Sequence, residues 1–146
     1  MNRCLQHRAI AFVAFTLLAT NALPTSAHEG AAVNLDTLPT LDAVAADAIQ
    51  ISPQVPNMGE HWARAADLPV GPIYCVIDGR VTCVEYMFQM MDLKAGTDWL
   101  KLAPGMETPP ISHIDIEFKP DGVGPNPEPL YQVHIYFATP ELLARH

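Results

Sequence analysis

Strict alternation of apolar and polar residues marks the second half of the chain. The segments "SHIDIEF" and "YQVHIYF" place every second side chain on the same side of an extended backbone, as in a strand with one buried face. Two β-branched runs flank Asp78-Gly79, a dipeptide typical of tight hairpins. The pattern therefore predicts four strands, over residues 72–78, 80–88, 111–118 and 131–138.

Helical signals are short and lie before, between and after these strands. Thr40 is an N-cap candidate in front of "LDAVAADAI", "MDLKAGTDWLKLAPG" predicts a short helix after the second strand, and "TPELLARH" predicts a helical turn after Thr139. Prolines cluster in the connections, as a sheet protein requires. The expected fold is one α+β domain, with a mainly antiparallel sheet, open or curled into a half-barrel, and one to three short helices.

The composition of the chain changes near residue 56. Residues 28–55 are rich in Ala, Leu, Asp and Pro, and apart from the helix after Thr40 we expect them to form an N-terminal arm or linker. Residues 56–146 carry the strand pattern and are expected to form the β-rich domain.

The first 27 residues have the pattern of a cleavable signal peptide. Arg3 and Arg8 precede an apolar run over 9–19 that is too short to span a bilayer, and Thr25 and Ala27 supply the small residues of a cleavage site. We expect an exported protein, periplasmic or secreted, with no membrane attachment after cleavage. Loss of the two arginines reduces the 8 basic residues to 6 against 16 acidic ones, so the net charge changes from −8 to −10. This acidic balance argues against binding of nucleic acid.

Two of the three cysteines, Cys75 and Cys83, remain after cleavage. An even pair in an exported chain is more often a disulfide than two free thiols, so we expect a bond between them. A two-residue Asp-Gly turn would pair Cys75 with Thr82 and point the two thiols to opposite faces. A three-residue loop or a bulge would instead place Cys75 opposite Cys83, and the sequence leaves the register open.

Alternation also sorts the polar side chains by face. If the strands are neighbours, one face of the sheet collects histidines and carboxylates, and the other face forms the hydrophobic core. The residues of the polar face are Glu85 in the second predicted strand, His113, Asp115 and Glu117 in the third, and Gln132, His134 and Tyr136 in the fourth. A sheet packed on one side shows the same alternation with its polar face simply solvated, so the pattern allows either a wet surface or a site.

Histidines are sparse in the predicted domain, and two of them lie at the centres of strands. Imidazole with carboxylate suits zinc, manganese, iron or nickel, and three protein ligands around an open position is the catalytic arrangement for zinc. No compact motif such as HxH or HExxH supports a site, which therefore depends on the strands being neighbours. The candidate ligands of one divalent metal are His61, Glu85, His113 and His134, with Glu60 and Asp115 as residues that would orient them or act as a general base.

Five segments, "MGEHW", "LPVGPIY", "VEYM", "ISHIDIEFKPDG" and "YQVHIYF", occur in this order over about residues 56–138. In this combination the chain resembles a group of small bacterial proteins without a settled activity, whose namesake is a Thermus protein of the extracytoplasmic-stress (sigma-E) regulon. The resemblance implies an exported, stress-associated β-rich domain that can self-associate. The matching positions are Met58, Gly59, His61, Trp62, 71–74, 85–87, His113, Asp115 and His134.

Two functions are consistent with these patterns. One is binding of a small ligand or a divalent metal by the His/Glu cluster, with or without catalysis. The other is a non-enzymatic structural or interaction module of the envelope stress response, assembled as a homo-oligomer in which the arm packs on a neighbour. They differ in whether the imidazoles of His61, His113 and His134 converge or point apart into solvent.

Overall fold

The computed structural model describes residues 30–124 and 126–146, so the expected signal peptide lies outside the described residues. The described chain forms one antiparallel sheet of six strands in the order β1-β2-β3-β4-β6-β5. The strands are β1 (Ile49–Val55), β2 (Gly59–Ala63), β3 (Ile73–Ile77), β4 (Arg80–Gln89), β5 (His113–Lys119) and β6 (Leu130–Tyr136). The predicted α+β class is confirmed, and the sheet is open rather than closed.

The described residues form three short helices, which begin or end where the sequence supplies capping residues. They are α1 (Leu41–Ala45), α2 (Met90–Ala95) and α3 (Pro140–Leu143), accompanied by the 3-10 turns η1 (Leu35–Thr37) and η2 (Ala65–Asp67). The Thr40 hydroxyl accepts a hydrogen bond from the Ala43 amide, and the Thr139 hydroxyl accepts one from the Leu142 amide, both at 3.3 Å. In the part of the chain that the structure describes, no helix has the length and apolar character needed to cross a membrane.

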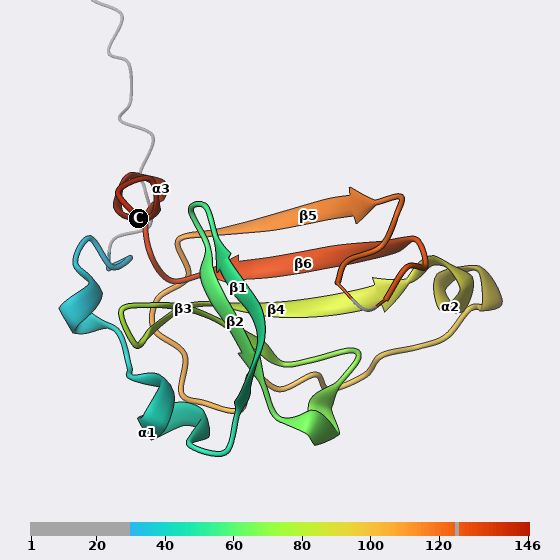
Figure 1. Ribbon diagram of the computed structural model, residues 1–146, viewed down its shortest axis with the longest axis horizontal. Coiled ribbons are helices and arrows are strands. Elements are labelled where there is room, and N and C mark those ends of the chain that lie inside the picture. Colours follow the sequence, from blue (N-terminus) through green and yellow to red (C-terminus); the bar gives the residue numbers. More distant parts are fainter. Residues whose placement is uncertain (1–29, 125) are drawn as a thin grey trace, which may run out of the picture.

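The sheet curves so strongly that its two ends face each other across a concave side (Figure 1). Residues of β1 and β2 at one end, and of β5 and β6 at the other, line the same cavity on this side. Helix α3 lies at one end of the cavity, where Pro140 and Leu143 contribute to its wall. The concave side is therefore enclosed by segments that lie far apart in the sequence.

The β3–β4 hairpin combines both registers that the sequence left open. Asp78 and Gly79 have φ values of +49° and +74°, as a tight two-residue turn requires, and Ile77 pairs with Arg80. A bulge at Thr82 then shifts the ladder, so that Cys75 pairs with Cys83. The expected disulfide joins these two cysteines, whose Cα atoms are 5.0 Å apart.

The four predicted strands are present as β3, β4, β5 and β6, whereas β1 and β2 were not predicted. The segment 28–55, expected to be an arm, is in its described part built into the domain. Leu35, Leu38 and Ala45 are buried in the core, and β1 is the first strand of the sheet. This strand escaped prediction because it is an irregular edge strand whose alternation is interrupted at Pro53.

In β5 and β6, the predicted buried face and the predicted solvent-facing face are reversed. The sequence placed the hydrophobic core on the face opposite the histidines, but Ile114, Ile116 and Phe118 on that face of β5 are 53%, 67% and 47% exposed. The loop that follows α2 covers the outward face of β3, where the Tyr74 hydroxyl donates to the Pro104 carbonyl (3.2 Å). This loop does not cover the outward face of β5. The curvature of the sheet encloses the opposite, polar face of that strand.

Gly59 allows β2 to approach β3 closely at the start of the strand that carries His61. Its φ of +88° is unfavourable for residues with a side chain, and a Cβ at this position would overlap the Val76 carbonyl oxygen. Gly79 has a similar φ of +74°, but a Cβ there would meet no atom within 4 Å.

These two glycines separate backbone strain from steric overlap. We expect Gly79→Ala to lower the free energy of unfolding by about 1 kcal/mol, the cost of an alanine at positive φ. Gly59→Ala should cost about 3 kcal/mol, because overlap with the β3 backbone is added to that strain. Urea denaturation followed by circular dichroism measures both values, and equal losses in the two variants would contradict the close approach.

Candidate metal centre

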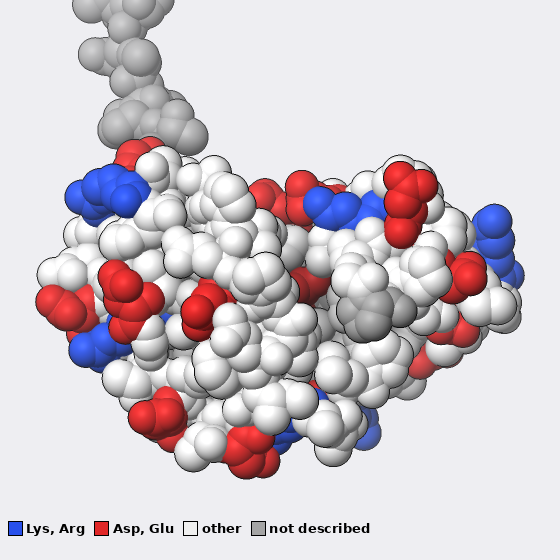
Figure 2. Space-filling view, in the orientation of Figure 1, with Lys and Arg blue, Asp and Glu red and all other residues white. Residues whose placement is uncertain are grey.

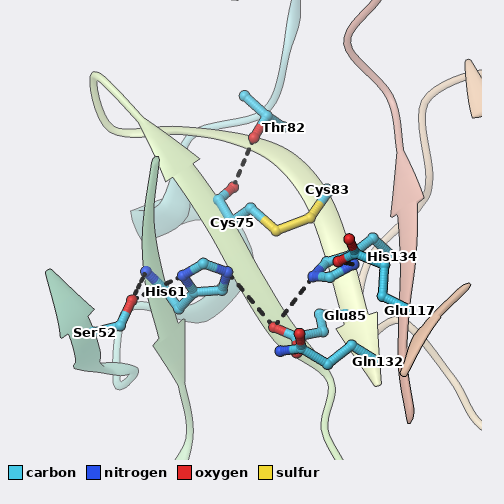
Figure 3. The surroundings of a disulfide bond; sticks show 9 residues. All are labelled: Ser52, His61, Cys75, Thr82, Cys83, Glu85, Glu117, Gln132 and His134. Carbon is cyan, nitrogen blue, oxygen red and sulfur yellow. Dashed lines mark hydrogen bonds and ion pairs between the residues drawn. A yellow bond between two sulfur atoms is a disulfide. The ribbon is translucent and has the colours of Figure 1, made fainter. Parts of the chain in front are cut away.

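Three polar side chains from three different strands converge on the concave side of the sheet (Figure 3). His61 on β2, Glu85 on β4 and His134 on β6 are 7%, 2% and 0% exposed. One donor atom from each of them lies within 4.8 Å of the other two. Buried groups of this kind require partners, so their surroundings decide what the cluster can do.

Strand register accounts for this convergence. Glu85 pairs directly with His134 across β4 and β6, which places both side chains on one face. His61 pairs with Cys75, and Cys75 pairs with Cys83, two residues before Glu85 on β4. The disulfide thus joins β3 to β4 beside the cluster, and curvature of the sheet brings the His61 ring to Glu85 (Figure 3).

His61 is held with one ring nitrogen facing the cluster. Its Nδ1 lies 2.8 Å from the Ser52 hydroxyl oxygen, and that hydroxyl donates its single proton to the Pro53 carbonyl at 2.9 Å. With that proton on the Pro53 carbonyl, the Ser52 oxygen accepts from His61, an arrangement in which the ring proton is on Nδ1. Nε2 is left with a free lone pair and lies 3.6 Å from Glu85 Oε2.

Glu85 is a buried carboxyl with one direct hydrogen bond from a side chain. The Gln132 amide donates to its Oε1 at 2.5 Å, and Oε2 faces the two histidines. Burial raises the pKa of Glu85 to about 7, an effect that the Gln132 hydrogen bond and the charge of Lys119 partly offset. Near neutral pH the carboxyl is consequently poised between its protonated and ionised forms.

His134 is fully buried, and neither of its ring nitrogens has a hydrogen-bond partner among the described residues. The nearest carboxylate oxygens are Oε2 of Glu85, 3.8 Å from Nε2, and Oε2 of Glu117, 3.9 Å from Nδ1. Both separations exceed hydrogen-bond length. Burial also lowers the pKa of His134 to about 4, so the ring is neutral and gains no charge pairing. A buried polar group without a partner costs about 1–3 kcal/mol, which calls for an explanation.

The spacing of the three donors suits a divalent metal ion. Two donors bound tetrahedrally at 2.0–2.1 Å lie about 3.3 Å apart. The Glu85 oxygen is 3.6 Å from His61 Nε2 and 3.8 Å from His134 Nε2, and all three donor atoms lie within 4.8 Å of one another, so the side chains would have to move inward to share one ion. Burial lowers the pKa of both imidazoles, and the neutral form it favours is the form that binds metals.

The structure does not bring the other predicted site residues into this group. The His113 ring stacks on Tyr136 with centroids 4.4 Å apart, and its Nδ1 lies 3.1 Å from the Ser112 hydroxyl. Asp115 pairs with His134 in the ladder, yet it is exposed at the rim. Glu60 alternates with His61 on β2, so it occupies the opposite face, where it accepts a hydrogen bond from the Trp62 indole at 3.0 Å.

Sequence reasoning missed three residues that contact the cluster. Gln132 holds Glu85, Ser52 holds His61, and Glu117 lies near His134. Alternation had placed Gln132 and Glu117 on the correct face, but a glutamine or glutamate on a strand carries no distinctive signal. Ser52 could not be found without β1, which the sequence did not predict.

A cavity of about 880 Å³ is lined by two of the three side chains, His61 and Glu85, while His134 lies buried behind them. The space-filling view shows the molecule hollowed near its middle, with acidic atoms visible inside the hollow (Figure 2). His61, Glu85 and Gln132 belong to its lining, so a small molecule in the cavity could reach the cluster.

Comparison with known proteins supports the fold and assigns no activity. The structure is similar to the crystal structure of the hypothetical protein TTHB210 from Thermus thermophilus, with a TM-score of 0.53 and 17% sequence identity. The match covers 62% of this chain and 87% of that chain. At this identity the likeness concerns the fold alone, and to that extent it agrees with the resemblance seen in the sequence. No protein-family model and no curated protein matches the chain.

Because the pKa of Glu85 is raised, the free energy of unfolding should depend on pH. The substitution Glu85→Gln isolates this contribution. The folded value is about 7 and the reference value is 4.5, so between these pH values the unfolded chain releases a proton that the folded protein retains. Rising pH therefore favours unfolding over this window. Relative to Glu85→Gln, which cannot titrate, we expect the metal-free wild type to lose about 3 kcal/mol between pH 4.5 and 7.

Urea denaturation in the presence of a chelator, repeated from pH 4.5 to 8, measures this difference. Glu141→Gln, at an exposed position of α3, is the matched control and should follow the wild type. If the free energy of unfolding changes with pH in the same way in wild type and Glu85→Gln, the pKa of Glu85 is not raised by burial.

Proposed function

We propose that the protein binds one divalent transition-metal ion through His61, Glu85 and His134. The observation that carries this proposal is the fully buried His134 ring, whose two nitrogens have no hydrogen-bond partner in the described chain. A metal bound to Nε2 would satisfy one of these nitrogens directly. Three protein ligands would leave at least one coordination position open toward the cavity, as in catalytic rather than structural zinc sites.

Charge supports the same proposal. Near pH 7 the two imidazoles are neutral, and Lys119, the only lysine or arginine among the described residues that line the cavity, lies 3.1 Å from Glu117. An ionised Glu85 thus has no dedicated cation among the described residues. A divalent ion would compensate its charge and would displace the carboxyl proton at neutral pH. Two imidazoles and one carboxylate form a donor set that suits Zn²⁺ and Fe²⁺.

Hydrogen bonds with neighbouring side chains hold two of the proposed ligands in position before any metal binds. Ser52 fixes the ring proton of His61 on the nitrogen that faces away from the cluster, and Gln132 orients the Glu85 carboxyl. Such hydrogen bonds set the direction and basicity of metal ligands. We also propose that the protein works outside the cytoplasm, because a disulfide buried beside the site fits an oxidising compartment.

Removing a ligand should abolish metal binding without removing the fold. We expect about one equivalent of Zn²⁺ per chain in the wild type, as three protein donors around one ion imply, and background levels in His61→Gln and His134→Gln. Ser52→Ala should weaken binding about 10- to 100-fold, because it removes only the group that orients His61. Elemental analysis and competition with a chromophoric chelator measure stoichiometry and affinity.

His113→Gln is the matched control for these substitutions. It removes an imidazole that lines the same cavity but lies outside the triad, so zinc binding should remain near the wild-type level. Loss of zinc in His113→Gln together with its retention in His134→Gln would overturn the assignment. Circular dichroism of every variant shows whether the sheet is intact.

We propose, as a second function, that the protein assembles with copies of itself through the outward face of β5 and β6. Ile114, Ile116 and Phe118 form an exposed apolar row on β5, the edge strand of the sheet. Exposed apolar surfaces of this kind are typical of interaction sites. Antiparallel pairing of two β5 edges centred on Ile116 would oppose Asp115 to Glu117, which like charges disfavour. Packing of two outward faces avoids that contact, so a second copy seated face to face is the arrangement we propose.

A charge in the centre of this face should prevent assembly. Ile116→Lys should shift the wild-type oligomer to monomer in analytical ultracentrifugation, because a lysine there cannot be buried against apolar neighbours. Val33→Lys is the control, since Val33 is equally exposed at 71% but lies outside this face. A monomeric wild type, or an oligomer that persists in Ile116→Lys, would refute assembly through this face.

A further inference from the structure

The cavity beside the metal centre has mostly apolar walls. Its apolar residues come from the β1–β2 hairpin, the segment before β3, the middle of β4 and helix α3. They include Ile51, Val55, Met58, Leu68, Met87 and Leu143. A cavity of about 880 Å³ with such walls and a few convergent polar groups has the size and character of a small-molecule site.

The carboxylates and the lysine that line this cavity lie at two places, and further polar residues of the lining are Ser52, Asn57, His113, Asn126 and Tyr136. His61, Glu85 and Gln132 form the floor, and Asp115, Glu117 and Lys119 on β5 form one rim. A molecule whose apolar body contacts the walls can direct an oxygen-donor head to the floor, where the proposed metal ligands His61 and Glu85 lie. At the floor one N–H of the Gln132 amide is engaged by Glu85, and the open metal position is the partner that attracts an oxygen-donor head group most strongly.

Charge restricts the head group further. A divalent ion with two neutral imidazoles and one carboxylate carries a net charge of about +1, which favours a neutral or singly anionic oxygen donor. Asp115 and Glu117 at the rim would repel a multiply charged anion, and the rim's Lys119 is paired with Glu117 at 3.1 Å. Phosphate esters and nucleotides are thereby disfavoured.

We infer that this site takes a small amphiphile, whose apolar body lies against the cavity walls while a carboxylate- or hydroxamate-type head binds the metal at its open position. This inference rests on the proposed metal site, and it adds the chemical class of the ligand. The apolar walls supply affinity through buried area, and the metal supplies orientation.

Alkyl hydroxamates of different length test both parts of the inference. Acetohydroxamate and octanohydroxamate share one metal-binding head, and the second carries six additional methylene groups. In the zinc-loaded protein we expect octanohydroxamate to bind at least about 100-fold more tightly, since each buried methylene adds severalfold and ordering of the chain offsets part of the gain. Isothermal titration measures both affinities, after a zinc titration of the same preparation.

Two methionines provide a matched pair of variants. Met87→Gln makes the cavity wall polar and should reduce the preference for the longer hydroxamate about tenfold, since part of the chain then contacts an amide. Met91→Gln makes the same change on α2, at a position 63% exposed and outside the cavity, and should leave the preference unchanged. Both variants should bind zinc like the wild type.

The outcomes separate this inference from the proposed metal site. Normal zinc binding with equal affinities for the two hydroxamates would overturn the amphiphile and leave the metal site standing. A preference for the longer compound that persists in Met87→Gln would place the chain elsewhere and would also overturn it. Equal binding of octanohydroxamate with and without zinc would show that the metal takes no part in binding the head group, and would overturn the inference. Absence of zinc binding in the initial titration would overturn both proposals.

Discussion

Burial of one carboxyl between two imidazoles is the constraint on which the rest of the molecule depends. Glu85 is 2% exposed and lies 3.6 and 3.8 Å from the two histidine nitrogens, and no lysine or arginine of the described residues forms an ion pair with it. An apolar side chain at that position would be the cheaper way to fill a core. Neighbouring side chains hold the group in place, because Gln132 donates a hydrogen bond to one Glu85 oxygen and the Ser52 hydroxyl is hydrogen-bonded to Nδ1 of His61. Such support is what a metal centre requires of the residues behind its ligands.

Backbone devices create this arrangement. The bulge at Thr82 brings Cys75 opposite Cys83, so the disulfide can form on the face that also carries Glu85. A bulge also increases local twist, and the twisted hairpin lets β2 fold over the concave side. Gly59 then permits close approach of β2 to β3, two residues before His61. A bulge and a close-packed glycine, which are irregularities of the sheet, thus help to position His61 and Glu85.

The sequence revealed periodic features and missed those that depend on curvature. Alternation identified β3, β4, β5 and β6 and placed Glu85 and His134 on one face, because a period of two is a local property. It could not say which face lies inside, since that depends on how far the sheet coils and on what the segment after α2 covers. His113 illustrates the limit: it shares the predicted face with His134, but it pairs with Tyr136, one step along the ladder from the triad. Ser52 lay in a strand without alternation, so nothing in its neighbourhood marked it.

The two proposed functions share strand β5, because its polar residues face inward and its apolar residues face outward. Inward residues of β5 form the acidic rim of the cavity, and outward residues of the same strand form the exposed apolar row. As an edge strand, β5 is held on one side only, by β6, so its position is less constrained than that of the inner strands. Packing of a second copy on the outward face would fix β5 without covering the cavity, which opens on the other face. Self-association would then steady the rim that a ligand must pass, so assembly and ligand binding would be coupled through the backbone of β5.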